Sequence, residues 1–142
     1  MIDGRIVKNF SLEEMSNNSA SDEIKLVLTP EVTRQAMMMQ ELREWCGKPL
    51  TVNSWYRTLG FNKSVGGDQN SCHLDGIATD LALTLTDAQR VLFIAIWNLI
   101  CVQYKVIGGI SIYNWGLHFD SNNTPTRYGT SNTNFRITDF RK

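Results

Sequence analysis

The sequence predicts an α+β domain in which helices pack on one face of a small antiparallel sheet. Three observations lead to this fold class. Helical and strand patterns are mixed along the chain, residues 106–113 and 117–120 read as the two strands of a late β-hairpin, and no repeat or linker divides the sequence. A length of 142 residues fits one domain. We expect a single domain over 1–142, with its core at about 9–121 and a polar C-terminal tail at 122–142.

The first helices are predicted from their capping residues. Ser11-Leu12-Glu13-Glu14 has the S-x-x-E form of a capping box, so a short helix is expected to start there. Thr29 followed by Pro30 is typical of an N-cap and the first helical position, and Gly47 supplies the stop. The apolar face of this second helix consists of Val32, Ala36, Met39, Leu42 and Cys46.

The remainder of the chain alternates between strands and one further helix. Thr86-Asp87 caps a helix from about Ala88 to Val102, which is apolar nearly all round and is therefore expected to be buried. The segment 62–70, which contains a Gly-Gly pair, reads as a loop. The predicted strands are 49–55, 77–85, 106–113, 117–120 and an edge strand at 135–140.

Composition and charge exclude several classes of protein. Lysine and arginine total 14 and are balanced by 14 acidic residues, which argues against a nucleic-acid binder because such proteins carry a basic surplus. The longest apolar run, 91–102, is too short to span a bilayer, and no secretory signal is visible at the N-terminus. Three widely spaced cysteines form no disulfide framework and are expected to be reduced, largely buried thiols. We therefore expect a soluble protein made in the cytosol.

The only two histidines suggest a metal site. A catalytic zinc site needs three ligands from histidine and carboxylate side chains, with a fourth position open for water. His73, in a loop before a strand, Asp80, within that strand, and His118, on a neighbouring strand, could supply this set. The alternative from spacing alone is two core histidines, each satisfied by a hydrogen bond.

The segments around these residues resemble a known family. Residues 71–80 read Ser-Cys-His-Leu-Asp-Gly-Ile-Ala-Thr-Asp, similar to the S-x-H-x-x-G-x-A-x-D signature of M15-type zinc peptidases. This family comprises D-alanyl-D-alanine carboxypeptidases and peptidoglycan endopeptidases, including many phage endolysins. Further segments that resemble the family in order are 10–15, 54–57, 62–67, 108–113 and 117–120.

The resemblance implies a role for each matched residue. His73, Asp80 and His118 would hold Zn²⁺, which polarises the scissile carbonyl and lowers the pKa of its bound water to about 7. Arg57 would bind a substrate carboxylate or the oxygen of the tetrahedral intermediate, the alternative being a salt bridge that holds its loop together. The residues expected to contact substrate are Trp55, Tyr56 and Ser71. Trp55 replaces the family's usual glycine and would narrow the cleft or stack on substrate, whereas the alternative for Ser71 is a hydroxyl that caps a turn.

The sequence departs from the family pattern at the general base. Many members place a carboxylate two to four residues before the last histidine, where this chain has Asn114, Trp115 and Gly116. Asp120 would share a sheet face with His118, so it is our candidate for the base, or else a group that orients a ligand. Asp75 is the other local carboxylate.

The expected function is hydrolysis of a peptide bond in peptidoglycan stem peptides by a zinc metallopeptidase, as in a phage or prophage lysis endopeptidase. Such an enzyme would stay in the cytoplasm until its release to the cell wall. The alternatives are a D-Ala-D-Ala carboxypeptidase, and a non-catalytic, zinc-stabilised cell-wall-binding or virion structural domain. We expect a monomer without a nucleic-acid partner or membrane span.

Overall fold

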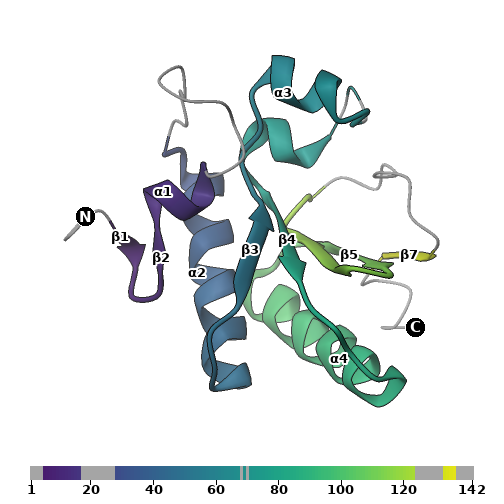
Figure 1. Cartoon of the computed structure of the whole chain (residues 1–142). Helices are drawn as coiled ribbons and strands as arrows, with labels where there is room; N and C mark the ends of the chain where they lie inside the picture. The colour runs from purple at the N-terminus through teal and green to yellow at the C-terminus, as the bar shows by residue number, and fades with distance from the viewer. Residues whose placement is uncertain (1–4, 17–27, 68, 70, 124–132, 137–142) are drawn as a thin grey trace.

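The computed structural model describes residues 5–16, 28–67, 69, 71–123 and 133–136. They form an α+β domain with a five-stranded antiparallel sheet of order β3-β4-β6-β5-β7 and a two-stranded ribbon, β1-β2 (Figure 1). The expected fold class is confirmed. The elements are β1 (Arg5–Val7), β2 (Phe10–Ser11), α1 (Leu12–Met15), α2 (Pro30–Cys46), β3 (Thr51–Ser54), α3 (Leu59–Ser64), the 3-10 helix η2 (Cys72–Asp75), β4 (Ala78–Ala82), α4 (Asp87–Tyr104), β5 (Gly109–Tyr113), β6 (Gly116–Asp120) and β7 (Thr133–Arg136).

The capping residues begin and end the helices where the sequence predicts. Ser11 closes a complete capping box at α1, and the side chains of Thr29 and Thr86 accept backbone hydrogen bonds at the starts of α2 and α4. Gly47 ends α2 with a left-handed φ of 68°, which glycine adopts at little cost. These local hydrogen bonds explain why the helix boundaries were predictable from short sequence patterns.

Two predicted boundaries differ from the structure. The segment 62–70 does not begin as a loop, because α3 continues to Ser64 after a start capped by Thr58. The edge strand predicted within the segment 122–142 is present as β7, which pairs with β5, but its bounds are shifted. Strand β7 begins two residues before the predicted edge strand, and residues 137–140 of that prediction lie outside the described residues.

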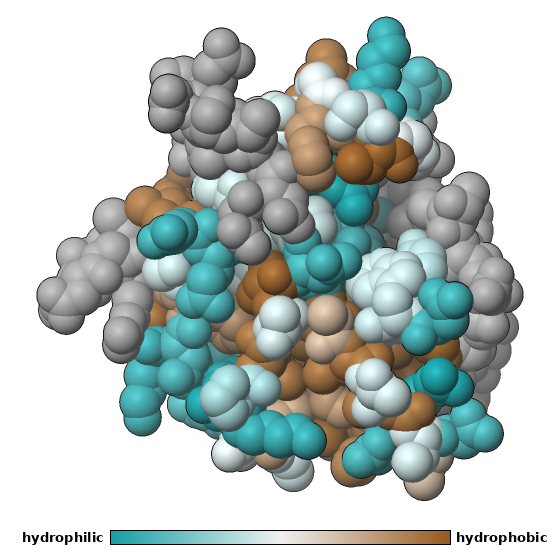
Figure 2. Space-filling view, viewed as in Figure 1, coloured by the Kyte–Doolittle hydropathy of each residue, from teal (hydrophilic) through white to brown (hydrophobic). Residues whose placement is uncertain are grey.

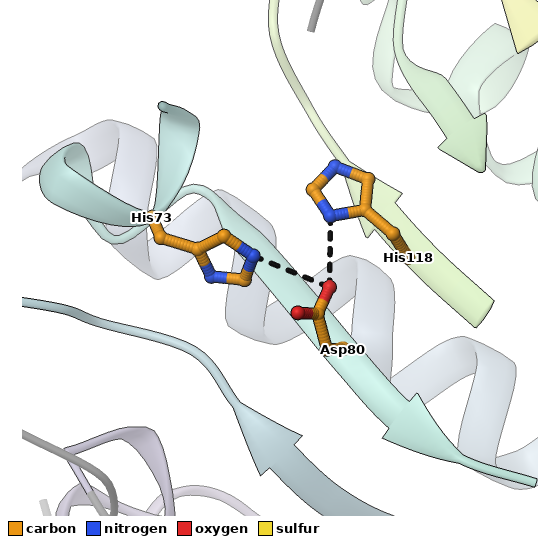
Figure 3. Close-up of side chains that lie close together, drawn as sticks. All are labelled: His73, Asp80 and His118. Atoms are coloured by element: carbon orange, nitrogen blue, oxygen red, sulfur yellow. Dashed lines mark hydrogen bonds and ion pairs between the residues drawn. The ribbon is translucent and has the colours of Figure 1, made fainter. Parts of the chain in front are cut away.

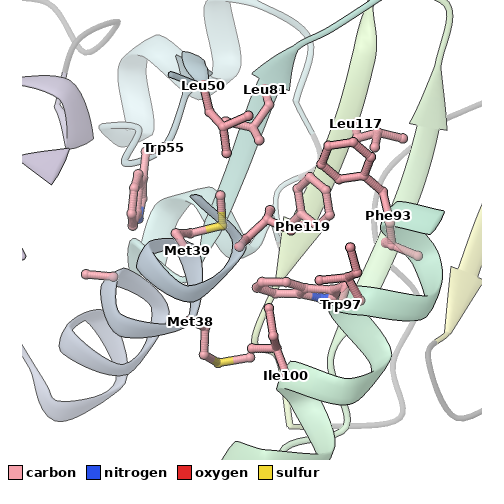
Figure 4. Packing of buried hydrophobic residues seen from close by; sticks show 14 of the residues in the cluster. Met38, Met39, Leu50, Trp55, Leu81, Phe93, Trp97, Ile100, Leu117 and Phe119 are labelled. Carbon is pink, nitrogen blue, oxygen red and sulfur yellow. The ribbon is translucent and has the colours of Figure 1, made fainter. Parts of the chain in front are cut away.

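Helices α2 and α4 cover one face of the sheet. Leu81 pairs with Leu117 across β4 and β6, and Thr79 pairs with Phe119, so all four side chains lie on this face. The Trp97 ring of α4 packs edge-on against Phe119 with ring centroids 5.0 Å apart (Figure 4). The hydrophobic core therefore lies between the helices and this face, leaving the other face for polar side chains.

A buried polar side chain attaches α2 to the centre of the sheet. Gln35 is fully buried, and its amide donates to the Thr79 hydroxyl at 3.1 Å and to the Phe119 carbonyl at 3.2 Å. These hydrogen bonds join α2 to both β4 and β6. The helix thus supports the two strands that carry most of the candidate site.

Helix α4 is not buried all round, contrary to the expectation from its composition. Its inner face contacts the core, whereas Val91, Leu92, Leu99 and Val102 are each more than half exposed. Figure 2 shows hydrophobic residues gathered below the centre of the displayed face, in the region where Figure 1 draws β4 and α4. Of the helices in the described part of the chain, none has the length and hydropathy that a bilayer-crossing segment needs.

A substitution at Gly116 tests whether β6 must approach β4 closely. A Cβ at this position would collide with the backbone carbonyl of Leu81, which cannot move aside as a flexible side chain would. We expect Gly116→Ala to lower the free energy of unfolding by about 1–3 kcal/mol, measured by urea denaturation of the metal-free protein. Gly60→Ala is the control, because a Cβ at Gly60 meets nothing within 4 Å. Equal stability of the two variants would contradict this account of the β4–β6 contact.

Candidate metal centre

The candidate site lies on the sheet face opposite the helices. In the β4–β6 pairing, Asp80 is directly opposite His118, so both side chains point to the same side of the sheet. The 3-10 helix η2 lies ahead of β4 in the chain and adds His73 to this pair (Figure 3). A strand pair and one short helical turn therefore bring together three residues separated by up to 45 positions in sequence.

The three side chains converge on one point. The Asp80 Oδ1 atom lies 2.8 Å from His118 Nδ1 and 3.2 Å from His73 Nε2. One ligand atom from each residue lies within 4.8 Å of the others, and all three residues are buried. Among the residues that the structure describes, no other group of three or more histidine, cysteine or acidic side chains converges in this way. Two imidazole nitrogens and one carboxylate oxygen are a donor set that suits Zn²⁺.

Hydrogen bonds to both its ring and its backbone orient His73. Its Nδ1 lies 2.6 Å from the Trp55 carbonyl oxygen, and a carbonyl only accepts, so Nδ1 carries the hydrogen. The Nε2 atom is then directed at the cluster, where it would offer its lone pair to a bound metal. The Ser71 hydroxyl accepts from the His73 backbone NH at 3.2 Å and caps η2, which Gly76 closes with a left-handed φ of 73°. Once a metal displaces any proton from Nε2, a ring held in this orientation is what a metal ligand requires.

His118 is oriented by a second carboxylate. Its Nε2 lies 2.9 Å from Asp120 Oδ2, on the side of the ring away from Asp80. Asp120 is fully buried, and its other oxygen accepts from the Asn122 backbone NH at 3.0 Å. The carboxylate therefore lies behind the ring and holds Nδ1 toward the cluster. This geometry favours the orienting role of Asp120 over the role of general base.

The charges of the metal-free cluster shift two pKa values in opposite directions. Burial lowers the pKa of His118, but hydrogen bonds to Asp120 and Asp80 outweigh it and raise that pKa to about 10. Burial likewise opposes the charged form of Asp80, yet the charge of His73 and hydrogen bonds from both histidines hold the Asp80 pKa well below its usual range. Without a metal, a proton on His118 balances part of the negative charge of the two carboxylates.

Arg57 lies at the edge of the cluster. Its Nη2 is 3.4 Å from Asp80 Oδ2, its Nε donates to the Ser54 hydroxyl at 3.0 Å, and its Nη1 donates to Asn62 Oδ1 at 3.2 Å. The ion pair with Asp80 matches the structural alternative that the sequence left open, and it also places the guanidinium beside a candidate metal ligand. Asn62 was not among the expected site residues, because its position depends on α3, which the sequence did not predict.

The expected substrate contact of Trp55 is wrong for this structure. Its ring is 1% exposed, packs edge-on against Phe10, and donates from Nε1 to the Gly76 carbonyl at 2.9 Å. A buried ring offers no surface on which a substrate could stack. Trp55 instead contributes its backbone carbonyl to the site, through His73. The Trp55 ring belongs to the hydrophobic core.

None of the remaining expected site residues belongs to the His-Asp-His cluster. Ser71 caps η2, as its structural alternative predicts, and half-buried Tyr56 follows Trp55 in the chain. Asp75 is exposed and lies outside the cluster, and Cys72 is buried without joining it.

One aromatic feature next to the site was missed. The rings of Tyr113 and Trp115 stack with centroids 4.6 Å apart at the end of the β5–β6 hairpin, and Trp115 is 38% exposed. Tyr113 is two residues from Ser111, which pairs with His118 across the two strands. The alternation of side chains therefore places Tyr113 on the same sheet face as the cluster. Tyr113 ends the segment 108–113 that resembles the family, but the sequence did not indicate that its ring stacks on Trp115.

The pKa of His118 predicts opposite effects of pH on the metal-free fold and on metal binding. Because this pKa is raised, protonated His118 stabilises the metal-free fold below the ordinary value of 6.5, and the contribution is lost as the pH rises through about 10. A metal must displace a proton from His118, so Zn²⁺ affinity should rise about tenfold per pH unit between these values. Calorimetric Zn²⁺ titrations in buffers of different ionisation enthalpy measure the released proton. Affinity that does not change with pH would contradict the assignment.

Comparison with known proteins agrees with the site. The family model described as Peptidase M15 matches residues 8–120, a span that includes every residue of the cluster. No curated protein and no solved structure gives a significant match. The family match covers most of the chain, and His73, Asp80 and His118 meet in space as a cluster that could hold a metal ion. On these grounds, the chain belongs to the peptidase M15 family.

Proposed function

We propose that the protein is a zinc-dependent peptidase that hydrolyses a peptide bond in peptidoglycan stem peptides. The observation that carries this proposal is the convergence of His73, Asp80 and His118 on one point. In each histidine ring, the nitrogen that faces away from the cluster has an oxygen acceptor of its own. A metal-ligating histidine usually donates its other ring N–H to a carboxylate or a backbone carbonyl, which is the arrangement of both rings here.

The residues of the cluster fit zinc in charge and donor type. A bound zinc ion supplies Lewis acidity, which polarises a carbonyl oxygen and lowers the pKa of a bound water to about 7. Asp80 contributes one negative charge, and the two neutral imidazoles contribute none. Three protein ligands leave a fourth position open, which is typical of catalytic rather than structural zinc sites.

Arg57 is proposed to bind the substrate beside the metal ligands. Its side chain is 16% exposed, and its guanidinium is held by Ser54, Asn62 and Asp80 in a fixed orientation. A preorganised guanidinium can stabilise the negative charge that develops on a carbonyl oxygen, or bind a peptide carboxylate. Tyr56 and Ser71 are proposed to contact the same substrate, because Tyr56 precedes Arg57 in the chain and the Ser71 hydroxyl bonds the backbone of His73.

The peptidoglycan substrate and the role in lysis rest on the sequence resemblance. We propose an endopeptidase of a phage or prophage that remains in the cytoplasm until it is released to the cell wall. A D-Ala-D-Ala carboxypeptidase would use the same site and differ only in the bond that is cut. The two are separated by their products, because only the endopeptidase opens an internal bond of the stem or cross-link, whereas the carboxypeptidase releases free D-alanine.

A digest of purified cell walls tests the proposed activity. We expect the purified protein to contain about one zinc ion per chain and to release muropeptides that mass spectrometry assigns to one scissile bond. EDTA should abolish the release, and added Zn²⁺ should restore it. Asp80→Asn should lose both zinc and activity, whereas Asp75→Asn, an exposed carboxylate outside the cluster, should retain both. Cleavage that continues without metal would refute the proposal.

A second candidate is a non-catalytic domain that zinc stabilises and that binds cell wall or belongs to a virion. The observation in its favour is the missing carboxylate before His118, where the chain has Asn114, Trp115 and Gly116. Asp120, the nearest carboxylate after His118, is fully buried behind that ring. Stoichiometric zinc without cleavage of any stem-peptide bond would favour this candidate.

Asp120→Asn separates the two roles considered for this carboxylate. If Asp120 orients His118, loss of its charge should weaken zinc binding about 10- to 100-fold, measured by competition with a chromogenic chelator. A general base would behave differently, since its loss would abolish turnover and leave zinc affinity unchanged. Asp75→Asn serves again as the matched control, with both zinc affinity and turnover preserved.

A further inference from the structure

The outer face of α4 is apolar and uncovered in the described part of the chain. Val91 is 65% exposed, Leu92 57%, Leu99 58% and Val102 52%. No charged residue occurs between Arg90 and Lys105, so this face lacks the lysines and glutamates that normally solubilise an outer helix surface. A strip of this kind on an otherwise well-formed helix indicates a contact surface.

The spacing of the exposed residues is that of a helix-packing seam. Ala88, Leu92, Ala95, Leu99 and Val102 are separated by four, three, four and three residues, and all five are exposed. This is the a/d pattern with which one helix packs along another at a small crossing angle. The same helix already uses its opposite side, which includes Trp97 and Ile100, against the core. The outer seam is therefore additional to what the fold requires.

We propose that this seam binds the seam of a second copy of the chain, with the two α4 helices antiparallel. In an antiparallel pair, the a positions of one helix face the d positions of the other. Leu92 and Leu99 occupy a positions, so Leu99 faces Ala95 of the second copy and Leu92 faces Val102 of the second copy. Large side chains then meet smaller ones in each layer, and the two-fold axis repeats each contact. An interface of this kind is self-complementary, as a closed dimer requires.

The charges at the ends of α4 favour the antiparallel direction. Asp87 begins the helix with a side chain that is 97% exposed, and exposed Lys105 follows its last residue. In the register given above, Asp87 of each copy approaches Lys105 of the other. Asp87 also contacts Arg90 of its own helix at 3.0 Å, and a carboxylate can accept from both cations. A parallel pair would instead bring like charges together at each end.

The proposed dimer leaves the metal cluster accessible. Helix α4 packs on one face of the sheet (Figure 1), whereas the strand register places the cluster of His73, Asp80 and His118 on the other. Each copy would therefore carry its own complete site, directed away from the two-fold axis. The inference does not depend on the proposed peptidase activity, and it replaces the monomer expected from the sequence.

Sedimentation equilibrium of the full chain tests the proposal. We expect a concentration-dependent mass that approaches twice the chain mass of 16.1 kDa. Leu99→Glu should give the mass of one chain at all concentrations, because it places two like charges in the seam. Ala95→Glu should act in the same way. The matched control is Leu59→Glu, which adds a glutamate at a leucine that is 70% exposed on α3 and should leave the dimer intact.

The helix direction is tested by exchanging the charges at the ends. Lys105→Asp should weaken the dimer, and the double variant with Asp87→Lys should restore it relative to the single change. Circular dichroism and thermal unfolding confirm that each variant is folded. The proposal is overturned if the unaltered chain sediments as a monomer at every concentration, or if Leu99→Glu and Leu59→Glu dimerise equally.

Discussion

The pairing of Asp80 with His118 across β4 and β6 is the constraint on which the rest of the site depends. Strand side chains alternate between faces, so a shift of one residue in this register would turn both ligands into the helix-covered core. The same shift would move Leu81 and Phe119 out of that core. One register therefore fixes both the hydrophobic core and the candidate metal centre. The absence of a side chain at Gly116 allows the close approach to the Leu81 backbone that this register requires.

Without a cation, burial of the two carboxylate charges of this site lowers the stability of the fold. Asp80 and Asp120 are both nearly or fully buried, and their charges flank one imidazole. A proton on His118 provides partial balance in the metal-free chain, which explains its raised pKa. A divalent ion would replace that proton with a larger charge. The fold thus maintains a site whose electrostatics favour occupation by a metal.

Much of this arrangement was predictable, and the failures have physical reasons. Helix ends followed from local caps at Ser11, Thr29 and Thr86, and the three ligands followed from the family signature. The position of Asp120 behind the His118 ring did not follow from the signature, because that position depends on which nitrogen of His118 faces Asp80. Trp55 was misassigned because burial depends on packing against residues distant in sequence. The outer face of α4 was missed for the same reason, since composition alone does not reveal which side of a helix lacks a partner.

The central claim is that His73, Asp80 and His118 hold one metal ion through defined atoms. Anomalous scattering at the zinc absorption edge, from crystals of the zinc-loaded protein, tests it most directly. The account predicts a single peak bonded to His73 Nε2, an Asp80 oxygen and His118 Nδ1, with Asp120 on the far nitrogen of His118. A peak bonded to His118 Nε2 or to Asp120, or no peak at the cluster, would contradict it.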